Sequence, residues 1–242
     1  HQDVGLRLSP ASLAIPIVPA AVLHDLTNGG DKAWGLNPPY QALGRASVAA
    51  ASTTFALGAV GAGRGSKAGL IKGGIGSTSL DLGDGLMVGA LVATNPVGSV
   101  LMPDGKTYWA WPFEIDKEFG GHRPSAGEPV TDPLPELGRL RAAGRLTPGA
   151  NTTLAVVAVS ARLTKAEAKR VAMMAQDGLA RAIRPVHAPF DGDTVFALTG
   201  GTADIGEGTE RLMQLSRIGS AAADCLARAI ARSVYCANSP PT

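Results

Sequence analysis

The sequence is poor in cysteine, in aromatic residues and in net charge, and each shortage excludes a class of protein. Its 242 residues include two cysteines, Cys225 and Cys236, both in one stretch of helical periodicity. They cannot form a disulfide framework, so we expect a reducing compartment and a cytoplasmic location. The formal net charge is +2, and acidic and basic residues are interspersed. Without a basic stripe or a membrane-length apolar run, neither nucleic acid nor a membrane is an expected partner.

Motifs for metals and nucleotides are incomplete. None of the four histidines lies in an HExxH or Cys/His cluster. Asp191-Gly192-Asp193 supplies two acids of a calcium loop, but no third acid and no closing glutamate follow. We therefore expect no metal.

The phosphate-binding motifs are also incomplete. Gly61-x-Gly63-x-Gly65 lacks the third glycine at the dinucleotide-binding spacing. Gly105-Lys106-Thr107 matches the last part of a P-loop motif, but Val100 stands where the first glycine of that motif should be. No cofactor is predicted, and a structural role for the glycines is favoured.

What the sequence has is ample apolar content, 45%, and 31 glycines, against 5% aromatic residues. This indicates one globular domain over 1–242 whose core packs small side chains closely. The periodicity predicts strands and helices in alternation, hence an α/β fold with helices packed on sheet. We predict an extended, buried segment over 13–26 and strands over 85–94, 153–159 and 194–199. A turn is predicted at 103–105 between two short strands, and a surface excursion over 113–150. Helices are predicted over 40–51, from the capping box Thr164-x-x-Glu167 until Pro185, and over 209–235.

Asn151-Thr152-Thr153 admits three interpretations. It matches the N-glycosylation pattern, it can be a loop that ends at a strand, or it is a processing site. In the third case the Thr152 hydroxyl attacks the preceding carbonyl, an N→O acyl shift gives an ester, and water completes the cut. The freed α-amine has an ordinary pKa of about 7.7–8.0 and can serve as the base for the hydroxyl beside it.

Longer stretches resemble a known family. They are GANTTLAVVAV, LTKAEAKRVAMMAQDGLARAIRPVHAPFDGDTVFAL, VGAG, IKGGIGS and ATNPVG. Together they resemble the DmpA family of L-aminopeptidase/D-esterases, which are self-processing N-terminal nucleophile hydrolases, and within it the nylon-oligomer hydrolases that use threonine. The resemblance implies a four-layer α/β/β/α sandwich of the DmpA/ornithine acetyltransferase type. It also implies a segment ahead of VPAAV that this sequence does not contain.

The resemblance also assigns roles to residues. Thr152 matches the nucleophile, freed by a cut at Asn151–Thr152 that gives fragments 1–151 and 152–242. Asp191 and Asp193 match the acidic pair that orients its amine and hydroxyl. Asn95 matches the amide that stabilises the tetrahedral oxyanion.

The resemblance also assigns two further positions. Lys72 matches a lysine beside the nucleophile, although a solvated loop lysine fits equally. His24 stands where relatives often carry tyrosine. Either His24 makes the hydrogen bond that the tyrosine would make, or that contact is lost.

The implied function is hydrolysis of peptide-like amides or linear polyamide oligomers by a homo-oligomer of cleaved pairs. One alternative is acyl transfer of the ornithine acetyltransferase type. Another is a non-catalytic, glycine-rich binding domain in which the Asn151–Thr152 bond stays intact.

Overall fold

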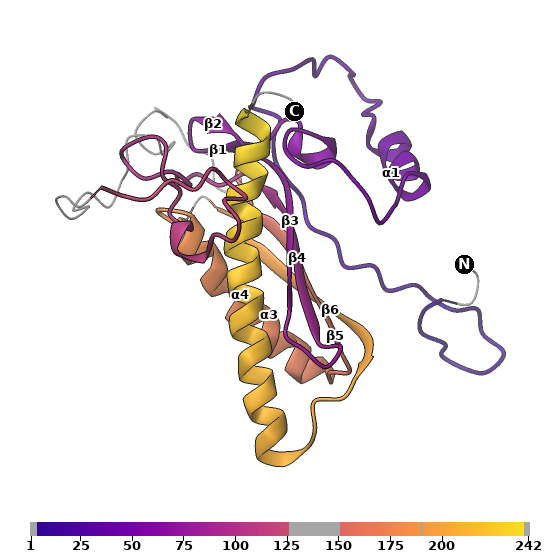
Figure 1. Ribbon diagram of the computed structural model, residues 1–242. Helices are drawn as coiled ribbons and strands as arrows, with labels where there is room; N and C mark the ends of the chain where they lie inside the picture. Colours follow the sequence, from indigo (N-terminus) through magenta and orange to yellow (C-terminus); the bar gives the residue numbers. More distant parts are fainter. Residues whose placement is uncertain (1–3, 126–150, 190, 240–242) are drawn as a thin grey trace.

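The computed structural model describes residues 4–125, 151–189 and 191–239, which build a sheet with two helices on one face (Figure 1). The sheet has the order β3-β4-β5-β6. Strands β3, β4 and β5 pair antiparallel, whereas β5 and β6 are parallel and are joined through helix α3. The α/β class and the alternation of strand and helix are confirmed. The elements are β3 (Gly74–Asp81), β4 (Met87–Thr94), β5 (Leu154–Ala161), α3 (Lys165–Ala182), β6 (Thr194–Ala203) and α4 (Gly208–Asn238).

The core lies between the sheet and the helices α3 and α4. Every second residue of β4 and β5 faces the helices and is buried. The facing surface of α4 is built largely of alanine with Ile218, Leu226 and Ile230, all fully buried. Helix α3 begins at the predicted capping box, because Thr164 accepts from the Glu167 amide and the Glu167 carboxylate accepts from the Thr164 amide. Small side chains on both layers explain how so few aromatic residues fill this core.

The glycine-dense region 58–79, for which the sequence indicated no element, contains an edge strand of the sheet. It forms the short helical turn η1 (Gly61–Gly63), the hairpin strands β1 (Lys67–Ala68) and β2 (Ile71–Lys72), and β3. Gly74 and Gly76 of β3 face α4, where a Cβ on Gly76 would lie 1.9 Å from the Ala229 carbonyl oxygen. These glycines therefore have the structural role that was expected, since they let the helix approach the strand backbone.

The N-terminal arm differs from the prediction. Residues 13–26 are extended, but they are not buried: Val18 and Val22 are 77% and 79% exposed. The backbone of Ile15 pairs with Leu6 of the same arm and not with the sheet, so the apolar side chains do not reach the core. The predicted helix is present as α1 (Tyr40–Ala49), and it buries no residue.

The region after β4 keeps the predicted turn without its strands. Gly105 has φ 71° and donates its N–H to the Met102 carbonyl at 3.0 Å. The flanking pairing is one isolated bridge between Leu101 and Tyr108, followed by the turn η2 (Trp111–Phe113). Of the predicted surface excursion over 113–150, residues 126–150 lie outside the described residues.

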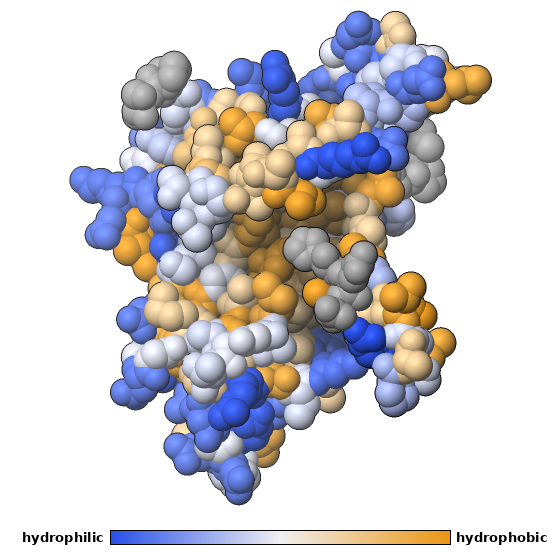
Figure 2. All heavy atoms as spheres, turned by 90° about the vertical axis from the view of Figure 1, so that its right-hand side faces the viewer, coloured by the Kyte–Doolittle hydropathy of each residue, from blue (hydrophilic) through white to orange (hydrophobic). Residues whose placement is uncertain are grey.

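The second face of the sheet is open. Leu91, Val156 and Leu198 point to this side, and they line hollows there together with the arm residues Pro19 to Ala21. Figure 2 shows the hollow with a largely hydrophobic floor. The described residues thus supply one helical layer and one four-stranded sheet of the sandwich.

Among the described residues, no helix is long and apolar enough to cross a membrane.

We predict that Gly76→Ala destabilises the fold by about 2 kcal/mol, because its Cβ would overlap the Ala229 carbonyl oxygen and force α4 from the sheet. Gly89→Ala is the matched control, since its Cβ would meet no atom closer than 3.5 Å. The measurement is the free energy of unfolding in urea. Equal losses in the two variants would contradict this account of the glycines.

A second prediction concerns acid stability. The hydrogen bonds from Arg211 and from the Thr164 amide lower the pKa of Glu167 from 4.5 to about 2. A lowered folded-state pKa stabilises the fold above the unfolded value and loses that contribution as the pH falls through the folded value. Glu167→Gln is therefore expected to lower the Tm at pH 7 and to lower it less at pH 2. Asp177→Asn, on the exposed side of the same helix, is the control and should show no such convergence.

Candidate active site

Three segments carrying predicted site residues meet at one end of the sheet. Asn95 directly follows β4, residues 151–153 directly precede β5, and residues 191–193 directly precede β6. Because β4 is antiparallel to β5 and β5 is parallel to β6, the end of β4 and the starts of β5 and β6 lie at the same edge.

The ladder between β5 and β6 continues back into the site. Asn151 pairs with Asp191 in a parallel bridge. The Thr194 N–H donates to the Thr153 carbonyl at 3.0 Å, and the Gly192 N–H donates to the Asn151 carbonyl at 2.9 Å. Strand pairing therefore fixes the backbone around Thr152 against the backbone between the two aspartates.

Thr152 is 4% exposed and lies against the bond that precedes it. Its hydroxyl Oγ1 donates to the Asn151 carbonyl oxygen at 2.6 Å, so that oxygen accepts hydrogen bonds from Thr152 and from Gly192. The Thr152 N–H donates to the Asn95 carbonyl at 3.0 Å. The hydroxyl, the peptide bond before it and a backbone donor on the carbonyl are thus assembled in one place.

Asn95 is fully buried and its amide group is held on both sides. Its Nδ2 donates to the His24 carbonyl at 2.9 Å, and its Oδ1 accepts from the Lys67 N–H at 3.0 Å and from Asn28 Nδ2 at 3.2 Å. Asn95 and Thr152 are in contact through the Asn95 backbone carbonyl, and the role of the Asn95 amide at the oxyanion stays a prediction. In this arrangement the donor on the Asn151 carbonyl is Gly192, not the Asn95 amide.

His24 reaches the site through its backbone. Its carbonyl accepts from Asn95, and the residue is half-buried. The nearby Asn28 bridges Asn95 and the Gly65 carbonyl. The N-terminal arm therefore contributes two contacts to Asn95.

Lys72 is exposed and lies at the β1–β2 hairpin. Its N–H donates to Asn238 Oδ1 at 3.3 Å and its carbonyl accepts from Asn238 Nδ2 at 2.9 Å, so these contacts are made with the end of α4. Its strand partner Lys67, rather than Lys72 itself, donates to Asn95. A role for Lys72 at Thr152 stays a prediction.

The two aspartates each accept a hydrogen bond from a backbone amide, one in the segment after β4 and one directly after Thr152. Asp191 Oδ1 accepts from the Val97 N–H at 3.0 Å, and Asp193 Oδ1 accepts from the Thr153 N–H at 2.9 Å. The second Asp193 oxygen, Oδ2, lies 3.1 Å from His187 Nδ1. Both carboxylates therefore contact backbone amides near Thr152, and their role at its amine and hydroxyl stays a prediction.

Sequence reasoning missed Gly192, Asn28 and His187. Gly192 and His187 stand within or just before the DGD motif, which is the only signal that the sequence offers for them. Asn28 carries none, because its partners are distant in the chain. Within the described ranges, no group of three His, Cys, Asp or Glu side chains is placed to hold a metal ion.

Comparison with known proteins places this chain in a family. The sequence profile of Peptidase family S58 matches residues 7–241, so the chain belongs to that family, and the DmpA resemblance is confirmed. An uncharacterized aminopeptidase of Mycobacterium tuberculosis is 40% identical over 91% of this chain and 63% of its own length. A 6-aminohexanoate-oligomer endohydrolase of Kocuria sp. is 28% identical over 78% of this chain and 51% of its own.

A solved structure supports the fold. The PH0078 protein of Pyrococcus horikoshii superposes with a TM-score of 0.50 at 24% identity, covering 78% of this chain and 47% of that one. At that identity the match shows a shared fold alone. The chain spans less than two thirds of the length of the mycobacterial relatives that it matches.

Proposed function

We propose that this chain is a self-processing amide hydrolase whose nucleophile is Thr152, freed as an N-terminus when the Asn151–Thr152 bond is cut. The observation that carries the proposal is the 2.6 Å hydrogen bond from Thr152 Oγ1 to the Asn151 carbonyl oxygen, on which the Gly192 N–H also converges at 2.9 Å. A nucleophile and a preorganised oxyanion donor at one carbonyl are what an N→O acyl shift requires.

The first step is the cut itself. Thr152 Oγ1 adds to the Asn151 carbonyl carbon, and the developing oxyanion is stabilised by the Gly192 N–H. The amide nitrogen of Thr152 leaves with the hydroxyl proton, which yields an ester between Asn151 and the threonine side chain. Water then hydrolyses the ester, leaving the Asn151 carboxylate and a free Thr152 amine and hydroxyl.

The second step is turnover of a substrate amide. The Thr152 amine takes the hydroxyl proton as Oγ1 attacks the substrate carbonyl, and it passes that proton to the departing substrate amine as the C–N bond breaks, which leaves an ester on Oγ1. Water, activated by the same amine, then hydrolyses the ester, releases the substrate acid and restores the hydroxyl. Asp193 keeps the peptide after the nucleophile in place through the Thr153 amide, and Asp191 holds the Val97 amide, two residues after Asn95. Asn95 is the proposed donor to the substrate's oxyanion.

The substrate class follows from the relatives. They are named as aminopeptidases and as 6-aminohexanoate-oligomer endohydrolases, and both names denote hydrolysis of amide bonds. We propose that this chain acts on the same bond, in peptide-like amides or in linear polyamide oligomers.

The decisive test is intact mass under denaturing conditions. The wild type should give two fragments, residues 1–151 and 152–242, and Thr152→Ala should give one uncut chain. Thr152→Ser keeps a hydroxyl and should still be cut. An uncut wild type would reject the proposal and favour a binding domain, and a cut in Thr152→Ala would assign the nucleophile elsewhere.

A second experiment separates hydrolysis from acyl transfer. The cut protein is given an aminoacyl p-nitroanilide with and without a competing amine, and the products that carry the acyl group are identified. Hydrolysis gives the free acid in both cases, whereas acyl transfer gives an amide of the added amine.

Gly192→Ala should slow the cut by about a hundredfold, a loss of the size caused by small misplacements of a nucleophile. Its N–H would remain, but the new Cβ would lie 3.0 Å from Thr152 Oγ1 and crowd the hydroxyl away from the carbonyl. The control is Gly200→Ala in β6, where an added Cβ meets nothing within 4 Å. The rate of fragment formation after cell-free translation is the measurement, and equal rates in the two variants would show that the cut does not depend on the space beside Thr152 Oγ1 that Gly192 leaves open.

A further inference from the structure

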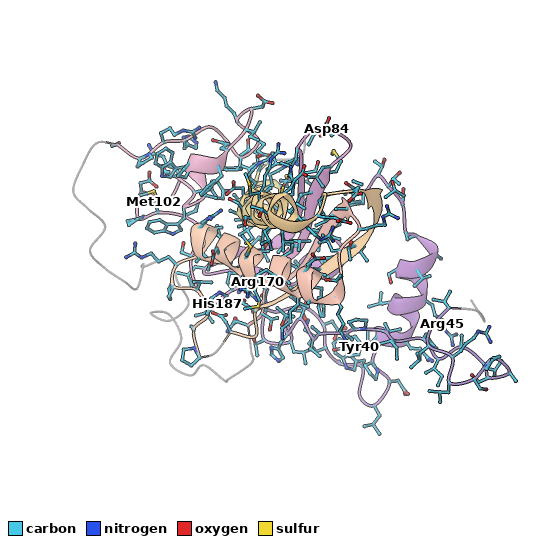
Figure 3. The ribbon with its side chains drawn as sticks, turned by 90° about the horizontal axis from the view of Figure 1, so that it is seen from below. Tyr40, Arg45, Asp84, Met102, Arg170 and His187 are labelled. Atoms are coloured by element: carbon cyan, nitrogen blue, oxygen red, sulfur yellow. The ribbon has the colours of Figure 1, made fainter. Side chains whose placement is uncertain are left out.

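His187 occupies the loop between α3 and β6 in an unusual backbone conformation. Its φ is 52°, in the left-handed region that favours glycine, and its side chain is 44% exposed. In Figure 3 it lies past the end of α3, on the side of the molecule away from Tyr40 and Arg45 of α1. A non-glycine residue held in this region costs conformational energy, and such residues concentrate at functional sites.

The imidazole meets a buried carboxylate. His187 Nδ1 lies 3.1 Å from Asp193 Oδ2, and the Asp193 side chain is 2% exposed. Within the part of the chain that the structure describes, this is the one basic nitrogen placed as an ion-pair partner of Asp193. The contact therefore joins the protein surface to the interior of the site.

The other oxygen of the same carboxylate reaches the residue after the nucleophile. Asp193 Oδ1 accepts from the N–H of Thr153, which is fully buried. A carboxylate can rotate about its side-chain bonds unless both oxygens are held. Oδ1 is held by the Thr153 N–H, and the imidazole nitrogen 3.1 Å from Oδ2 limits how far the carboxylate can turn, and with it the peptide that follows Thr152.

We propose that His187 is a positioning residue that acts through Asp193 to keep Thr152 Oγ1 on the Asn151 carbonyl. The inference rests on the proposed function, because the geometry it maintains is that of the cut. His187 need not touch the reacting atoms. Its imidazole nitrogen, 3.1 Å from Oδ2, makes the ion-pair contact that opposes rotation of the Asp193 carboxylate away from Thr153.

Three replacements separate the possible roles of His187. Asn keeps an N–H donor at about the position of Nδ1 and tolerates positive φ. Gly tolerates positive φ but has no donor, and Phe keeps a ring of similar shape without a donor. We expect His187→Asn to be cut at nearly the wild-type rate, and His187→Gly and His187→Phe to be cut about tenfold more slowly, as for the loss of one charge-assisted hydrogen bond.

The measurement is fragment formation over time after cell-free translation, followed by mass under denaturing conditions. His122→Ala, which removes an exposed histidine elsewhere on the surface, is the matched control and should be cut as the wild type is. The Tm of each chain in a Thr152→Ala background shows whether a slow variant is simply less folded.

The outcomes are distinct. A wild-type rate for His187→Gly or His187→Phe would overturn the inference, because a side-chain donor would then be unnecessary. A rate for His187→Asn as slow as that for His187→Gly would also overturn it. An uncut wild type would reject the proposed function itself, and the positioning role would fall with it, whereas a cut wild type with indifferent variants would reject His187 alone.

Discussion

The parallel register between β5 and β6 is the constraint on which the site depends. Leu154 pairs with Thr194, and further back along both strands Asn151 pairs with Asp191. That alignment sets the Gly192 N–H on the Asn151 carbonyl. A slip of β6 by one residue along β5 would turn each of its side chains to the opposite face of the sheet and remove this donor. The hydrophobic pattern of β5 prevents such a slip, because its buried residues face α3 and α4 while the others face the open side.

The second constraint comes from the packing of α4 on β3 and β4. Glycines in β3 bring the helix close, and at that distance Ser233 Oγ donates to Thr94 Oγ1 at 2.7 Å inside the core. Thr94 is the last residue of β4, and Asn95 follows it directly. The position of Asn95 is therefore set by a helix that carries none of the proposed chemistry. This links the glycine-rich composition to the site, because bulkier residues on β3 would displace α4 and so the end of β4.

Elements with strong local signals could be predicted from the sequence, and those set by tertiary contacts could not. The capping box at Thr164 and the apolar run before Ala161 specify α3 and β5 by themselves. β3 could not be recognised, because glycine has low strand propensity and is present there for the approach of α4. The prediction that residues 13–26 are buried was wrong for a related reason. An apolar run favours burial, but it does not specify whether the fold offers a surface against which the run can pack. At the site, the pairing of Thr152 with Asp191 and Asp193 came from family resemblance. Gly192 and His187 emerge only when the register of β5 on β6 is known.

The two carbonyls that Thr152 would attack, its own chain's and a substrate's, need not use the same donor. In the uncut chain the Asn151 oxygen takes the Gly192 N–H, and this bond is one rung of a buried ladder. After the cut, Asn151 bears a carboxylate, and an oxygen of that group is the natural partner of the same N–H. A substrate oxyanion then needs another donor within reach of Thr152. The Asn95 amide fits, because its present partner is the His24 carbonyl on the loosely packed N-terminal arm, and that bond costs less to exchange than a rung between two strands. In the proposed mechanism, Gly192 would therefore serve the single cut and Asn95 would serve every later turnover. Processing and hydrolysis would then respond separately to changes at these two positions.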